Sequence, residues 1–102
     1  MPPYQLIPAA EDDLREIARY TLKQWGKAQS LRYAALLEQC FMEIAGRSRL
    51  FRTPLERYPF LRVSRCQHHY VFYLHLESQP PRIIAVLHEK MDMLRRLANR
   101  LP

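Results

Sequence analysis

The chain has 102 residues with a net formal charge of +6, and 48% of its residues are hydrophobic and 25% charged. This length suits one hydrophobic core, so we expect a single domain over residues 1–102. No apolar run approaches the roughly 20 residues that cross a bilayer, and residues 1–4 do not begin a secretion leader. These features exclude a membrane-spanning protein and predict a cytoplasmic location.

Positive charge lies almost entirely in the second half of the chain. Residues 1–45 carry five Lys or Arg and six Asp or Glu, a net charge of −1, whereas residues 46–102 carry eleven and four, a net charge of +7. This asymmetry indicates either an acidic partner, such as a nucleic acid or an acidic protein, or a basic solvated surface. The charge pattern alone favours neither.

The first half predicts a short strand over residues 4–7 and then two amphipathic helices. Pro8 ends the strand because it lacks an N–H group, and the acidic residues 11–13 suit the first turn of a helix. Apolar residues then recur at helical spacing as far as Gly26, and again over residues 27–45 as far as Gly46, with each glycine expected to end a helix. The one-residue break predicts an antiparallel helical hairpin. Its buried stripes are expected to contain Leu14, Ile17, Ala18, Thr21, Leu22, Trp25, Leu31, Ala34, Leu37, Phe41, Ile44 and Ala45.

The second half predicts strands, followed by a last helix. Residues 47–59 contain four arginines and two prolines without a clear period, which indicates a basic loop. Alternating segments predict strands at residues 60–64 and 70–76, and the apolar run 83–87 suits a central strand. A helix is expected from Lys90 to Leu101. The order β-α-α-β-β-β-α predicts an α+β fold with the hairpin packed on an antiparallel sheet and the first strand beside the last.

The two cysteines, Cys40 and Cys66, form no CxxC motif. Disulfides are rare in the cytosol, so we expect two buried thiols. A metal site that combines Cys66 with His68 and His69 is the alternative. We expect no cofactor and no metal.

RNA cleavage would need an acid, a base and cations that neutralise the phosphorane. The candidates are Arg62, Arg65, Arg82, His69 and His88. Structural roles are favoured for both histidines, with His88 at a strand-to-helix junction and His69 packed or paired across strands. His68 and His75 are expected to be exposed. Tyr73 is expected in the core, and because it shares a strand face with His75, a small exposed patch is the alternative. No established catalytic motif is present, so we expect no enzymatic activity.

The pair Asp12-Asp13 resembles a catalytic pair of carboxylates. Adjacent helical residues point in different directions, however. We therefore expect both residues to act as charges at the N-terminus of the first helix.

Three blocks of the sequence resemble toxins of the ParE family, within the ParE/RelE group. The first block is Ala10-x-x-Asp13-Leu14-x-x-Ile17-x-x-Tyr20-Thr21, followed by Trp25-Gly26. The second is His69-Tyr70-Val71-Phe72-Tyr73, and the third is Ile84-x-Val86-Leu87-His88-x-x-Met91-Asp92. Together they span nearly the whole chain, and the resemblance implies a RelE-like fold.

The resemblance also implies a toxin of a type II toxin–antitoxin system. A small antitoxin would neutralise it in a hetero-oligomer by laying an acidic segment over the sheet edge and the groove beside the hairpin. The expected antitoxin-binding residues are Arg62, Arg65, Arg95, Arg96 and Arg100. Growth inhibition is expected through protein–protein contact with DNA gyrase. The alternatives are a RelE-like ribosome-dependent mRNA endoribonuclease and a non-toxic nucleic-acid-binding module, and no target-binding residue is predicted.

Overall fold

The structure is a computed structural model that describes residues 3–89 and 91–102. Met1, Pro2 and Lys90, the expected first residue of the last helix, lie outside the described residues. The elements are β1 (Gln5–Leu6), α1 (Pro8–Trp25), α2 (Lys27–Ala45), β2 (Leu61–Cys66), β3 (His69–Leu74), β4 (Arg82–His88) and α3 (Met93–Ala98). This is the predicted order of elements. None of the helices in the described part of the chain is long and apolar enough to span a bilayer.

The strands pair in the order β1-β4-β3-β2. As predicted, β2, β3 and β4 form an antiparallel meander, with Val71 opposite Ser64 on one side and Val86 on the other. As also predicted, β1 lies beside β4, but the two run parallel, with Gln5 opposite Arg82. The sequence did not predict the direction of this pairing: β1 enters alongside the start of β4 before the chain turns into α1.

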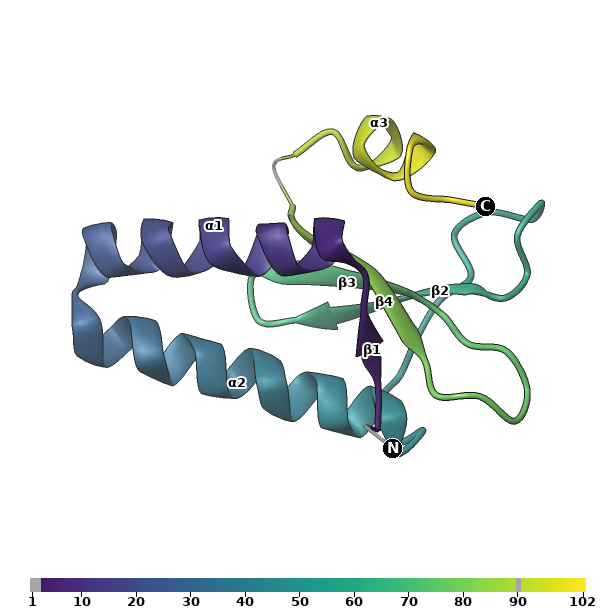
Figure 1. The fold of residues 1–102 in the computed structure, drawn as a ribbon, viewed down its shortest axis with the longest axis horizontal. Helices are drawn as coiled ribbons and strands as arrows, with labels where there is room; N and C mark the ends of the chain where they lie inside the picture. Colours follow the sequence, from purple (N-terminus) through teal and green to yellow (C-terminus); the bar gives the residue numbers. More distant parts are fainter. Residues whose placement is uncertain (1–2, 90) are drawn as a thin grey trace.

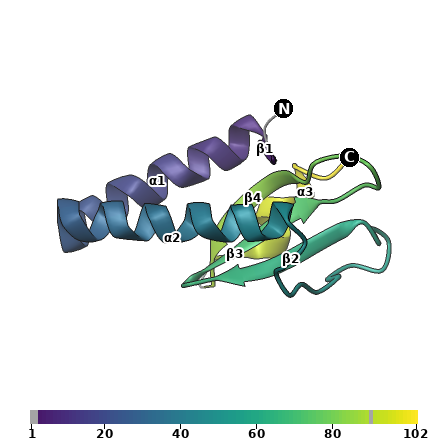
Figure 2. The same cartoon turned by 90° about the horizontal axis from the view of Figure 1, so that it is seen from below.

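Helices and loops cover both faces of the sheet (Figures 1 and 2). The hairpin of α1 and α2 packs on one face, where Leu37 and Phe41 share a core with Val71 and Val86. On the other face α3 and part of the basic loop form a second core around Leu97. Residues 83–87 of β4 are at most 2% exposed, which confirms the prediction of a central strand buried on both sides.

The start of α1 and the end of α2 differ from the prediction for local reasons, whereas the end of α1 at Gly26 agrees with it. α1 begins at Pro8 itself, because a proline in the first turn of a helix forfeits no hydrogen bond. It ends at Gly26, whose φ of 85° lies in the left-handed region that favours glycine. At the end of α2 the left-handed residue is Arg47, with φ of 61°, and the predicted Gly46 has φ of −81°. Gly46 therefore does not end its helix in the way that Gly26 does.

The turn end of the hairpin projects beyond the sheet (Figures 1 and 2). The 18 residues of α1 extend about 27 Å, whereas the six residues of β3 extend about 20 Å. The sheet therefore cannot cover the last turn of α1 or the first turn of α2. Leu22, Trp25 and Leu31, predicted to be buried, are 52%, 50% and 62% exposed.

Tyr73 is buried in the core, as expected, whereas the exposed position expected for His75 is wrong, because its side chain is buried too. The Tyr73 hydroxyl lies 3.3 Å from the hydroxyl of Ser64 inside the core. His75 follows the end of β3. Burial, together with the positive charges of Arg47 and Arg62, lowers the pKa of His75.

Cys40 of α2 and Cys66 of β2 form a disulfide. The prediction of two buried thiols, and the alternative of a metal site at Cys66, are therefore wrong. The packing of α2 against β2 places the two Cα atoms 6.2 Å apart, within the range that a disulfide spans.

The last helix is shorter than predicted. α3 begins after Asp92, whose side chain accepts a hydrogen bond from the backbone N–H of Arg95 at 3.2 Å. The chain beyond the helix still packs, because Leu101 contacts the second core.

Candidate partner-binding surface

A buried ion pair joins α1, β4 and the C-terminal tail. The Asp13 carboxylate accepts hydrogen bonds from the Arg100 guanidinium at 2.6 and 3.1 Å, and from the backbone N–H of Val86 at 2.9 Å. The side chains of Asp13 and Arg100 are only 7% and 13% exposed. Asp13 therefore does not act as the helix N-terminal charge that we predicted, and Arg100, predicted to bind an antitoxin, is already engaged inside the chain.

Tyr33 makes the hydrogen bond that orients the ring of His69. Its hydroxyl oxygen accepts from the backbone N–H of His68 at 3.1 Å and lies 2.6 Å from Nδ1 of His69. We place the single phenolic proton toward Nδ1, which leaves His69 neutral with its own proton on Nε2. Burial, and then the nearby His88 and His68, lower the pKa of His69 to about 4, although Asp13 acts in the opposite direction. At neutral pH His69 therefore accepts a hydrogen bond through Nδ1, keeps its one hydrogen on Nε2, and carries no extra proton to donate as an acid.

The structure separates the residues considered for RNA cleavage. The rings of His69 and His88 are adjacent on the hairpin face of the sheet, with centroids 5.3 Å apart. Arg65 projects from the opposite face of the sheet, where it pairs with Glu89 at 3.1 Å. Arg62 and Arg82 lie toward the other end of the meander. Arg62 is paired with Tyr73 across β2 and β3, and Arg82 is paired with Leu74 across β4 and β3. Within residues 3–89 and 91–102, no group of three or more His, Cys, Asp or Glu is placed to hold a metal ion.

An open groove of about 690 Å³ lies between the projecting end of the hairpin and the adjoining ends of β3 and β4. Its walls combine aromatic side chains of the hairpin with three histidines, and we call it the aromatic groove. Tyr20 and Trp25 are 60% and 50% exposed there, and their rings meet edge to face at 6.3 Å. Exposed aromatic surface of this kind is typical of sites that bind another protein.

A second hollow of about 480 Å³ continues from the aromatic groove along α3. Met91 lines both cavities. Arg95 and Arg96 are exposed in this second cavity, which we call the arginine hollow. Three of the predicted antitoxin-binding residues thus line this hollow, because Arg100 also borders it, and the hollow adjoins the aromatic groove at Met91.

Arg62 and Arg65 lie apart, because residues three positions apart in a strand point to opposite faces. The Arg62 guanidinium lies 4.1 Å from the centre of the Phe51 ring. The outer edge of β2 between the two arginines is closed by the chain itself, since the backbones of Arg52 and Val63 exchange two hydrogen bonds of 2.9 Å. A partner therefore cannot add a strand to the sheet at this point unless the loop moves.

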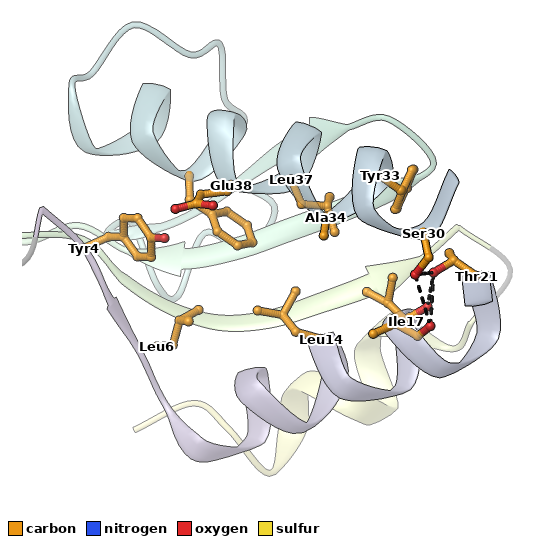
Figure 3. A pocket seen from close by; sticks show the side chains of 12 residues that line it. Tyr4, Leu6, Leu14, Ile17, Thr21, Ser30, Tyr33, Ala34, Leu37 and Glu38 are labelled. Carbon is orange, nitrogen blue, oxygen red and sulfur yellow. Dashed lines mark hydrogen bonds between the residues drawn. The ribbon is translucent and has the colours of Figure 1, made fainter. Parts of the chain in front are cut away.

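An apolar slot of about 220 Å³ separates the two helices of the hairpin (Figure 3). Leu14 and Ile17 of α1 face Leu37 of α2 across it. The hydroxyls of Thr21 and Ser30 join the helices near the turn at 2.9 Å. Ile17 and Thr21 line both the slot and the aromatic groove, so apolar surface is continuous along this side of the hairpin.

Sequence reasoning missed Tyr20, Trp25 and Met91 as exposed surface residues. All three belong to the blocks that resemble the ParE family. The lengths of the predicted elements could have indicated this exposure, because the predicted helices are longer than the predicted strands and must extend past the end of the sheet.

The fold identifies the structural class. The structure matches a chain from a solved structure described as "Chromosomal ParDE TA system from P. aeruginosa" with a TM-score of 0.68. Sequence identity is 10%, and the match covers 83% of this chain and 92% of that chain. The protein therefore has the α+β, RelE-like fold that the resemblance predicted.

Sequence comparison identifies the family. Residues 4–93 match the family model described as ParE toxin of type II toxin-antitoxin system, parDE. The chain is 48% identical over 101 residues to Toxin ParE of Escherichia coli, covering 99% of this chain and 98% of that protein. It is 32% identical over 94 residues to Toxin ParE1 of Mycobacterium tuberculosis H37Rv, covering 92% and 96%. The chain belongs to the ParE toxin family of type II toxin–antitoxin systems.

Proposed function

We propose that this protein is a cytoplasmic toxin held inactive by a small cognate antitoxin, and that it acts by protein–protein contact rather than by catalysis. Membership of the ParE family supports the toxin role. The observation that carries the binding proposal is the junction at Met91, where the aromatic groove meets the arginine hollow. A segment with apolar side chains followed by carboxylates would match both parts.

Charge and burial support different steps of this binding. The +7 charge of residues 46–102 would draw an acidic, partly disordered segment toward the surface of α3. Apolar side chains of the segment would then cover Tyr20 and Trp25, which lie half exposed in the free protein. Aromatic anchors usually contribute most of the binding energy of an interface, whereas exposed charges mainly set the association rate. The aromatic groove is therefore expected to supply most of the affinity, and the arginines are expected to raise the association rate.

Reversing the charges of Arg95 and Arg96 tests the arginine hollow. The double variant Arg95→Glu, Arg96→Glu is expected to bind the product of the adjacent small reading frame at least about tenfold more weakly at low salt, mainly through slower association. Surface plasmon resonance at two salt concentrations measures this effect. The matched control is Arg32→Glu with Arg82→Glu, which makes the same charge change at exposed positions away from both cavities.

Equal weakening in the two double variants would mean that only net charge matters, and it would remove the arginine hollow from the proposed interface. No binding by the unmodified protein would contradict the antitoxin proposal as a whole. Arg62 and Arg65 stay in the proposal as peripheral contacts. Arg100 is assigned to the internal ion pair.

DNA gyrase is the target that we propose, on the strength of family membership. The neutral state of His69, and the separation of the arginines from the histidine pair, favour contact over RNA cleavage. Purified protein is expected to inhibit supercoiling by purified gyrase, and the antitoxin is expected to reverse the inhibition. Intact supercoiling together with cleavage of ribosome-bound mRNA would instead identify a RelE-like nuclease. Salt-sensitive nucleic-acid binding without growth inhibition would identify a non-toxic binding module.

A further inference from the structure

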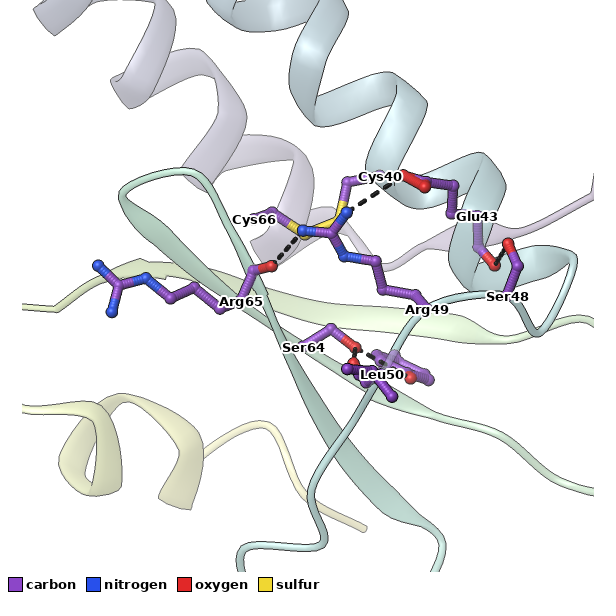
Figure 4. A network of polar contacts seen from close by, with 9 residues as sticks. Cys40, Glu43, Ser48, Arg49, Leu50, Ser64, Arg65 and Cys66 are labelled. Carbon is purple, nitrogen blue, oxygen red and sulfur yellow. Dashed lines mark hydrogen bonds and ion pairs between the residues drawn. A yellow bond between two sulfur atoms is a disulfide. The ribbon is translucent and has the colours of Figure 1, made fainter.

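Two separate links join the C-terminal half of α2 to the end of β2 (Figure 4). The first is the disulfide between Cys40 and Cys66, which closes a loop with a sequence separation of 26 residues. Both cysteines are buried, with 3% and 0% exposure. β2 is one of the two edge strands of the sheet and pairs with β3 alone, so the disulfide fastens a strand that the sheet holds on one side.

The second link is made by Arg49 and contains no sulfur. The Arg49 guanidinium donates to the backbone carbonyl of Arg65 at 2.5 Å and to the Glu43 carboxylate at 3.2 Å. Arg65 directly precedes Cys66, and Glu43 lies one helical turn after Cys40, so this bridge spans the same two segments as the disulfide (Figure 4). The side chains of Arg49 and Glu43 are about one-third exposed, at 30% and 35%.

We propose that Cys40 and Cys66 form a reversible redox staple on the edge strand β2. When oxidised, the staple restrains the unfolded chain and stabilises the toxin. When reduced, the two thiols remain packed as small apolar groups, and the Arg49 bridge keeps α2 and β2 together. Arg49 is then a positioning residue, because it holds the two sulfur atoms close enough to react again.

The exchange reaction needs a thiol or disulfide partner, and glutathione is of the right chemical class. One cysteine thiolate attacks a sulfur of glutathione disulfide, forms a mixed disulfide and releases one glutathione thiolate. The second cysteine thiolate displaces the second glutathione, so two protein thiols are oxidised while one glutathione disulfide is reduced to two thiols. Since both cysteines are buried, exchange has to proceed through local opening of this edge.

Melting temperature measures the staple directly. The full-length protein is prepared oxidised in glutathione disulfide or reduced in dithiothreitol, and the thiols are counted by alkylation and mass spectrometry after denaturation. The oxidised protein is expected to melt on the order of 10 °C higher than the reduced protein. The double variant Cys40→Ala, Cys66→Ala is expected to melt at the same temperature in both buffers.

The Arg49 bridge is tested by the equilibrium with glutathione. Arg49→Ala is expected to shift the dithiol–disulfide equilibrium toward the dithiol on the order of 3- to 10-fold, whereas Arg32→Ala on an exposed face of α2 leaves it unchanged. If Arg49→Ala fails to fold, Glu43→Gln, which weakens only one side of the bridge, is expected to give a smaller shift in the same direction.

Several results would overturn the staple. They are failure of the pair to oxidise, oxidation without a rise in melting temperature, and a disulfide that cannot be reduced while the protein stays folded. Equal behaviour of Arg49→Ala and Arg32→Ala would overturn the positioning role. None of these measurements involves an antitoxin or gyrase, so they are independent of the proposed function.

Discussion

Replacement of Asp13 by alanine is expected to lower the free energy of unfolding by about 3–5 kcal/mol, because removing one partner leaves the other charge of a buried pair uncompensated. Arg100 would keep its charge in a site where its side chain is only 13% exposed. The backbone N–H of Val86, in the buried central strand, would also lose its acceptor. Urea denaturation followed by circular dichroism measures the change.

The neighbouring Asp12 provides the matched control. Asp12 pairs with Arg15 on the surface, with side chains 69% and 62% exposed, so Asp12→Ala is expected to cost less than about 1 kcal/mol. The double variant Asp13→Asn, Arg100→Met removes both charges and keeps an acceptor for Val86, so it is expected to be more stable than Asp13→Ala. A loss below 1 kcal/mol for Asp13→Ala would contradict the picture of a buried ion pair that holds the tail in place.

The sequence could predict the elements because each has a local cause. Helical spacing that ends at Gly26 predicted α1, and the continuous apolar run 83–87 predicted the central strand. The sequence also carried the family resemblance. Its three blocks lie mainly on α1, β3 and β4, and residues of these three elements line the aromatic groove.

The interactions that complete the site join residues far apart in sequence. Asp13 and Arg100 are 87 positions apart, and the pair becomes visible only when the tail folds back over β4 and α1. An acidic residue near the start of a helix is usually explained by the helix dipole, so the local pattern indicated the wrong role. The disulfide was missed for the same reason, because the packing of α2 against β2 brings the two cysteines together.

Periodicity also cannot show where a core ends. Trp25 and Leu31 continue the apolar stripes of their helices, yet they lie past the end of the sheet. The projecting end of the hairpin forms one wall of the aromatic groove. Trp25, wrongly predicted to be in the core, therefore belongs to the surface proposed to bind a partner.

Acidification is expected to destabilise the protein through His69. Its pKa is about 4 in the folded protein and about 6.5 in an unfolded chain, so the unfolded state binds the proton first as the pH falls. Neutral His69 makes its full contribution to the free energy of unfolding above pH 6.5, and this contribution is lost progressively between pH 6.5 and pH 4. The full loss is on the order of 3 kcal/mol. Urea denaturation at several pH values from 7.5 to 4.5 measures the slope.

His69→Gln separates titration from packing, because glutamine does not titrate and its carbonyl can still accept a hydrogen bond from Tyr33. The variant is expected to be less stable than the unmodified protein at pH 7.5, and the difference should shrink or reverse at pH 4.5. Tyr33→Phe, the control, removes the hydroxyl that lies 2.6 Å from Nδ1. It is expected to lower stability at every pH while most of the slope remains, because burial is the main cause of the lowered pKa of His69. If His69→Gln kept the full pH slope, the acid sensitivity would have to come from other groups, and the neutral Tyr33–His69 pair would not be its source.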